Sequence, residues 1–91
     1  MAGEYRQVMI GETTPDAVTV GIEKHADGEI SAAVWWDEVG DVDADEAEYV
    51  SVGAALKAAE AAQTLHGFSE VVVALQDGLA WQAEWGMLSR G

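Results

Sequence analysis

Three aspartates at alternate positions, Asp41, Asp43 and Asp45, are the first residues whose types and spacing could do chemistry. Alternating carboxylates open many calcium-binding loops, where they supply oxygen ligands to the ion. Such a loop also needs a glycine at its turn and a bidentate glutamate at its end, and this chain has Glu46 and Val52 there. We therefore assign no metal site to this segment, because helix capping and solvation account for its acids.

A second set of carboxylates comprises Glu12, Glu48 and Asp77. We expect three strands, a helix whose first turn contains Glu48, and a fourth strand that ends just before Asp77. This core resembles the front of a ribonuclease H-like domain, over about residues 5 to 77. In that family, carboxylates from the first strand, the first helix and the fourth strand hold two magnesium ions. The resemblance implies a metal-dependent or metal-binding role for Glu12, Glu48 and Asp77, which we keep as the alternative function.

The chain departs from the ribonuclease H-like pattern at two of these positions. The first strand has no internal aspartate, only Glu12 beyond its end, and Asp77 belongs to an Asp-Gly turn. The core also resembles the small antitoxin-type partial ribonuclease H folds, but it lacks their segment with glycine and proline. No glycine-rich phosphate loop or nucleophile elbow is present, and no serine has a histidine and an aspartate in a triad pattern. These departures and the missing motifs favour a protein that is not an enzyme, with no catalytic residue and no cofactor.

The charge balance excludes one class of partner. Seventeen acids stand against four bases, which gives a net charge of −13. Four scattered bases cannot neutralise a phosphate backbone, so we expect no nucleic-acid partner. Three explanations of the acidity stay open: a solvated surface, adaptation to a high-salt cytoplasm, and a basic partner.

Length and composition indicate one α+β domain over residues 1–91, with an ordered core at about 4–86. Because the chain has no cysteine, disulfides and thiolate metal sites are excluded. No run approaches the roughly 20 apolar residues of a membrane span, and no apolar signal segment follows Met1. We expect a cytoplasmic protein with no membrane partner.

One long helix is predicted over residues 45–68. Asp45 and Glu48 have the spacing of a capping box at its start. Gly67 occupies the place of a left-handed C-cap, and Phe68 follows it for a closing hydrophobic contact. The buried face of this helix is mostly alanine, so the helix must lie close to a surface that supplies bulkier side chains.

Five strands are predicted around the helix, at residues 5–11, 17–24, 29–36, 70–75 and 79–85. A three-residue turn that ends at a left-handed Gly28 pairs Ile22 with Ala32, which collects one apolar face on the first hairpin. The same turn at Gly78 would pair Leu75 with Leu79.

These elements define a five-stranded, mostly antiparallel sheet in the sequence order β-β-β-α-β-β, with the helix on one face. The fourth strand can lie beside the first or the third, because a helical crossover returns it parallel to both. We favour the spatial order 3-2-1-4-5. Residues 87–91 are expected to form a loose tail.

Trp35 and Trp36 are neighbours on one strand, so their side chains point to opposite faces of the sheet. Trp36 completes the face that the helix covers, which leaves Trp35 on the back. The residues expected around Trp35 are small or uncharged: Ala33, Ser31, Thr19 and Gly21. Such a strip is typical of a partner surface, although a tryptophan can also lie flat on its own sheet. We therefore predict a non-enzymatic interaction module that self-associates as a homodimer, or binds a protein partner, through this strip.

Overall fold

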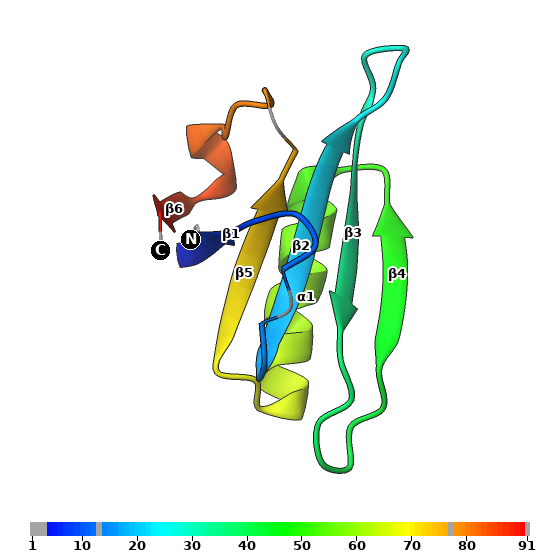
Figure 1. The fold of residues 1–91 in the computed structure, drawn as a ribbon, viewed down its shortest axis with the longest axis vertical. Helices are drawn as coiled ribbons and strands as arrows, with labels where there is room; N and C mark the ends of the chain where they lie inside the picture. Colours follow the sequence, from blue (N-terminus) through cyan, green and yellow to red (C-terminus); the bar gives the residue numbers. More distant parts are fainter. Residues whose placement is uncertain (1–3, 13, 77, 91) are drawn as a thin grey trace.

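The computed structural model describes residues 4–12, 14–76 and 78–90. One α-helix packs on one face of a mixed sheet of six strands (Figure 1), which confirms the predicted α+β class. The elements in chain order are β1 Glu4–Val8, β2 Ala17–Lys24, β3 Ile30–Trp36, β4 Asp45–Tyr49, α1 Val52–His66, β5 Glu70–Leu75, the short 3-10 helix η1 Ala83–Trp85, and β6 Met87–Arg90.

The strands lie in the order β4-β3-β2-β5-β1-β6. Neighbours are antiparallel in the pairs β2–β3 and β3–β4, and parallel in β2–β5, β1–β5 and β1–β6. The order differs from the predicted 3-2-1-4-5, because β5 separates β1 from β2. β6 adds a strand at residues 87–90, which we had expected to lie beyond the ordered core.

The predicted start of the helix at Asp45 is wrong. Residues 45–49 form β4, which pairs with β3 from Trp36 opposite Asp45 to Ala32 opposite Tyr49. The helix begins after Ser51, whose Oγ accepts a hydrogen bond from the backbone N–H of Ala54 at 3.1 Å. Asp45 and Ser51 both have the chemistry of an N-cap. The helix begins after Ser51, because residues 45–49 pair with β3 as a strand.

The later start of the helix, and the strand β4 that precedes it, explain the strand order. The three-stranded meander is β2-β3-β4 rather than β1-β2-β3, and β5 returns from the helix to lie parallel to β2. Counted from β2, the order is 3-2-1-4, the same pattern as the predicted one, but the strand at residues 45–49 belongs to the meander and the strand at residues 4–8 does not. β1 is then an added strand on the far side of β5.

The end of the helix and the first hairpin agree with the sequence prediction. Gly67 is left-handed at φ 76°, and its N–H donates to the carbonyl of Gln63 at 2.9 Å. Gly28 has φ 90°, and Ile22 lies opposite Ala32. Both features follow from local rules of capping and alternation, which need no knowledge of the rest of the fold.

The predicted second hairpin at 79–85 is wrong, because β5 has no free edge for it: β2 lies on one side and β1 on the other. The segment instead turns toward the core on the side of the helix. The ring of Trp81 packs against Tyr5 and Trp85, at centroid distances of 6.0 and 5.1 Å, and its indole N–H donates to the carbonyl of Gly86. The predicted pairing of Leu75 with Leu79 is therefore not formed.

The core lies between the sheet and α1. Its fully buried side chains are mostly β-branched residues of β2 and β5, and the helix contributes Ala55, Ala59 and Ala62 with the bulkier Val52 and Leu56. The prediction of an alanine-rich contact face is confirmed. Small side chains bring the helix close to the sheet, so that the β-branched side chains fill the layer between them.

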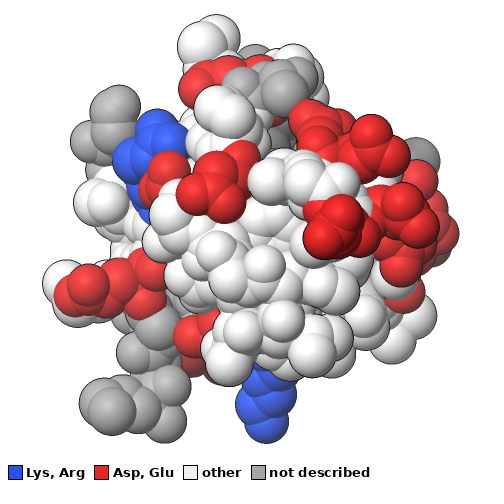
Figure 2. All heavy atoms as spheres, turned by 90° about the horizontal axis from the view of Figure 1, so that it is seen from below, with Lys and Arg blue, Asp and Glu red and all other residues white. Residues whose placement is uncertain are grey.

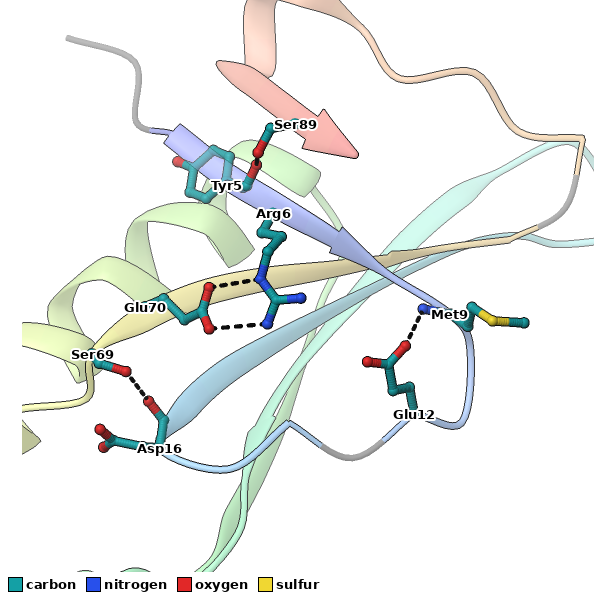
Figure 3. A network of polar contacts seen from close by, with 8 residues as sticks. All are labelled: Tyr5, Arg6, Met9, Glu12, Asp16, Ser69, Glu70 and Ser89. Atoms are coloured by element: carbon teal, nitrogen blue, oxygen red, sulfur yellow. Dashed lines mark hydrogen bonds and ion pairs between the residues drawn. The ribbon is translucent and has the colours of Figure 1, made fainter. Parts of the chain in front are cut away.

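The connection from β1 to β2, described at residues 9–12 and 14–16, crosses the face of the sheet opposite α1 (Figure 1), which we call the back face. It must cross β5, because β1 and β2 are parallel strands on either side of it. A second small cluster is buried on this face: Val8, Ala17, Val72 and Ala74. The end of the loop is fixed where both the N–H and the Oγ of Ser69 donate to the carbonyl of Asp16 (Figure 3).

Candidate partner-binding site

Strand alternation places the two tryptophans as predicted. Trp36 packs on the helix side against Phe68 and His66, with ring centroids 5.9 and 5.5 Å away. Trp35 lies on the back face, half-buried, with its ring across Gly21 of β2. A Cβ at position 21 would stand 2.6 Å from two ring atoms of Trp35, so the indole and the backbone are in direct contact.

Beside Trp35 the back face is hollowed by a groove of about 520 Å³. The crossover loop forms one wall with Ile10 and Gly11, and β4 forms the other with Glu48 and the following Val50. The floor consists of β2 and β3 residues, among them Gly21, Glu23, Ser31, Ala33 and Trp35. We call this the back groove. Its volume lies in the range of about 300–1,000 Å³ that is typical of ligand pockets.

Two aliphatic side chains at the groove walls are exposed to solvent. Ile10 is 61% exposed and Val50 is 94% exposed. The apolar surface of the groove therefore continues outward onto its rim. Exposed apolar surfaces of this kind are common where proteins contact partners or ligands.

Four of the five predicted partner-binding residues line the back groove: Trp35, Ala33, Ser31 and Gly21. Thr19 does not, because it is 4% exposed and lines a separate, smaller cavity beneath the loop. Ile10 and Val50 were not predicted from the sequence to belong to this site. Each is an apolar residue just beyond the end of a strand, and that position is the signal that could have marked them.

A histidine and a serine meet in the back groove. His25 Nε2 and Ser31 Oγ are 2.6 Å apart, and both residues line the groove. No histidine was assigned to Ser31 from the sequence, although the predicted hairpin register places Glu23 opposite Ser31 and His25 two residues further along. Nucleophilic catalysis also requires a group that orients the histidine and donors for an oxyanion. Among the described residues His25 has no acidic hydrogen-bond partner, so this pair positions two polar groups without completing a catalytic triad.

The carboxylates of the ribonuclease H-like alternative do not converge in the described part of the chain. Glu48 lies on β4 rather than in the helix, and the first turn of α1 contains no acid. Glu12 accepts a hydrogen bond from the N–H of Met9 within the crossover loop. Asp77 lies outside the described residues. Within residues 4–12, 14–76 and 78–90, no cluster of three or more acids, histidines or cysteines could hold a metal ion.

The β3–β4 hairpin concentrates the negative charge. Residues 37–48 contain seven acids and no base, and all seven acids are exposed. Its tip is closed by a pair of backbone hydrogen bonds between Val39 and Val42. Figure 2 views the end of the molecule that carries this hairpin and shows the densest group of acids on one side, further acids around the rest of the view, and basic side chains at two separate places.

One base on the back face is already paired. The Nε and Nη2 atoms of Arg6 donate to the two carboxylate oxygens of Glu70, each at 3.0 Å (Figure 3). These hydrogen bonds lower the pKa of Glu70, while its partial burial opposes the shift. The same pair raises the pKa of Arg6. Both side chains are about one-third exposed, so solvent screens much of this interaction.

The fold and the groove define a small α+β protein with an apolar surface beside an acidic hairpin. Comparison of the chain with models of protein families, with curated proteins and with solved structures found no match. In the part of the chain that the structure describes, neither helix has the length and apolar character needed to cross a membrane.

Proposed function

We propose that this protein is a non-enzymatic interaction module that binds a protein partner through the back groove. The observation that carries this proposal is the groove itself. It is apolar, it continues onto two exposed aliphatic side chains, and it lies on the face of the sheet that the helix leaves uncovered.

A protein surface fits the groove better than a small molecule does. A ligand that filled only the hollow would contact Ile10 and Val50 from one side and leave much of both side chains in water, since they are 61% and 94% exposed. A partner that spans the rim would cover both. Burial of an aliphatic side chain contributes on the order of 1.5–3 kcal/mol, so covering the rim adds substantially to the affinity.

The groove is held in shape before any partner arrives. The ring of Trp35 rests on Gly21, and a serine and a histidine on the floor are hydrogen-bonded to each other. A preorganised surface loses less conformational entropy on binding, which favours tight association. Tryptophan is also among the residues that most often dominate the energy of an interface. We place this interaction in the cytoplasm, on the composition of the chain alone.

Selection of short random peptides from a displayed library tests the proposal. The affinity of an enriched peptide is then measured by fluorescence anisotropy against wild type, Ile10→Ser and Leu65→Ser. Leu65 is the matched control, because it is 78% exposed and lies near the end of the helix, away from the groove. We expect Ile10→Ser to weaken binding by about tenfold and Leu65→Ser to leave it unchanged. Equal affinity for all three proteins would reject the groove as the binding site.

A further inference from the structure

The back groove joins apolar walls to an acidic rim, and we propose that its partner is a basic protein segment. Such a segment would place a bulky apolar side chain against Trp35 and Ile10, and lysines or arginines beside Glu48. This inference rests on the proposed function and adds the chemistry of the partner.

The charges around the groove have one sign. Glu23 and Glu48 line it, and no lysine or arginine of the described chain does. Glu48 lies directly opposite Ala33 in the β3–β4 ladder, so its carboxylate stands one strand away from the apolar floor. Of the bases described elsewhere, Arg6 is paired with Glu70, and Lys57 lies on the helix. Lys24 alternates to the face of β2 opposite that of Glu23, and Arg90 ends β6 at the sheet edge farthest from β4. A cation bound at the rim would meet acids without local competition.

The hairpin extends this acidic surface beyond the groove. Its seven exposed acids at residues 37–48 continue directly from the strand that forms one groove wall. Such a one-signed field raises the rate of encounter with a partner of opposite charge and disfavours acidic partners. The apolar groove and the acidic hairpin thus select the same kind of partner by two different interactions.

A second copy of this chain fits the surface poorly. In a two-fold dimer the same patch meets itself, so two acidic rims that contain no lysine or arginine among the described residues would be brought together. Each copy also carries a net charge of −13, which opposes association. Self-association is therefore the competing outcome, and it is measurable in the same experiment.

The probe is the peptide library described above, followed by titrations of the best binder. We expect enrichment of lysine and arginine around a bulky apolar residue. Affinity should fall by about tenfold as NaCl rises from about 0.05 M to about 0.5 M, because salt screens the rim contacts. Glu48→Lys should weaken binding by about tenfold. Glu4→Lys, a matched change of an exposed acid on β1, should leave groove binding within about twofold of the wild-type value after correction for net charge.

The outcomes separate the two proposals. If enriched peptides lack basic residues and bind independently of salt, while Ile10→Ser still weakens them, the basic partner is rejected and the groove stands. If Ile10→Ser and Leu65→Ser bind alike, both proposals fail. Sedimentation of the wild type at tens of micromolar in about 0.5 M NaCl tests the remaining possibility, which is self-association. A dimer that Ile10→Ser dissociates would replace the basic partner by a second copy.

Discussion

The indole ring of Trp35 lies across Gly21 of the neighbouring strand, so closely that a Cβ on residue 21 would be 2.6 Å from two of its atoms. Residue 21 is directly opposite Ala33, so the ring of Trp35 reaches it diagonally across the β2–β3 pair. An aromatic ring that covers a glycine in this way protects the backbone from solvent and is itself held in place. The glycine is thus part of the groove.

Gly21→Ala should destabilise the protein although alanine suits a strand better than glycine. The replacement gains about 0.5–1 kcal/mol of backbone entropy. Displacing the ring of Trp35 costs on the order of 1–3 kcal/mol of packing, so we expect a net loss of about 1 kcal/mol. Urea unfolding measures the loss, and near-UV circular dichroism reports the displaced indole.

Gly53→Ala is the control for this substitution. A Cβ there would find Ser51 Oγ at 3.7 Å, which is an ordinary contact, and residue 53 is helical. Here the entropy gain is unopposed, and stability should rise by about 0.5–1 kcal/mol. If Gly21→Ala behaved like Gly53→Ala with an unchanged near-UV spectrum, the ring would not rest on Gly21.

The cap at Ser51 provides a test of where the helix begins. Its Oγ accepts the N–H of Ala54, whereas Asp45 Oδ1 accepts the N–H of the next residue within β4. Ser51→Ala should therefore cost about 1 kcal/mol of stability, the usual value for an N-cap. Asp45→Ala should cost much less. The reverse ranking in chemical denaturation would restore Asp45 as the start of the helix.

The parts of the fold that sequence reasoning predicted are those determined by neighbours in the chain. The left-handed Gly28 fixes the register of the β2–β3 hairpin, and Gly67 ends the helix. The opposite directions of Trp35 and Trp36 follow from alternation alone. The start of the helix was missed because Asp45 and Ser51 both have capping chemistry, and only pairing with β3 decides between them.

The candidate site also has a part determined by neighbours in the chain and a part determined by distant segments. The strand residues Trp35, Ala33, Ser31 and Gly21 were placed correctly, because they share a face by alternation. The other wall, at Ile10, comes from a loop whose path depends on the insertion of β5 between β1 and β2. That insertion is a non-local event, and no short stretch of sequence encodes it.

The Arg6–Glu70 pair makes part of the stability depend on pH. The folded state lowers the pKa of Glu70, chiefly through the hydrogen bonds from Arg6. A lowered carboxyl pKa contributes stability above the unfolded pKa, about 4.3, and this contribution is lost as the pH falls through the folded pKa. Wild type should therefore melt above Glu70→Gln at pH 7, and the difference should vanish as the pH falls well below 4.

Glu4→Gln controls for the loss of one negative charge, since Glu4 is exposed and makes no ion pair with the described residues. Its melting temperature should differ little from the wild-type value across the same pH range. A difference for Glu70→Gln that persists unchanged into acid would show that the carboxylate contributes through packing rather than through its charge.

Salt should stabilise this protein. Seven of the 17 acids lie on the β3–β4 hairpin, and the described residues contain one ion pair, so the repulsion that comes with a net charge of −13 is largely uncompensated. Raising NaCl from about 0.01 M to about 0.5 M shortens the Debye length from about 30 Å to about 4 Å. The melting temperature should rise over this range, and Asp41→Asn/Asp43→Asn should flatten the curve. A wild-type curve that is already flat would mean that the acids do not repel each other measurably.

The two adjacent tryptophans separate binding from folding. Trp35 lies against the back groove, whereas Trp36 packs on Phe68 and His66 and donates its indole N–H to the carbonyl of Asp43 at 3.0 Å. Trp35→Ala should weaken a selected peptide by about 2 kcal/mol, as expected for an interface hot spot, with a smaller effect on stability. Trp36→Ala should cost on the order of 2 kcal/mol of stability through lost packing.

The comparison is made by measuring peptide affinity and urea unfolding on both variants. Both substitutions remove an indole, so their difference reports the side of the sheet on which it stood, together with the hydrogen bond from Trp36 to Asp43. A Trp35→Ala protein that loses as much stability as Trp36→Ala, while it binds the peptide like wild type, would assign Trp35 to the fold alone. Trp35 would then serve to cover Gly21, and the groove beside it would need another explanation.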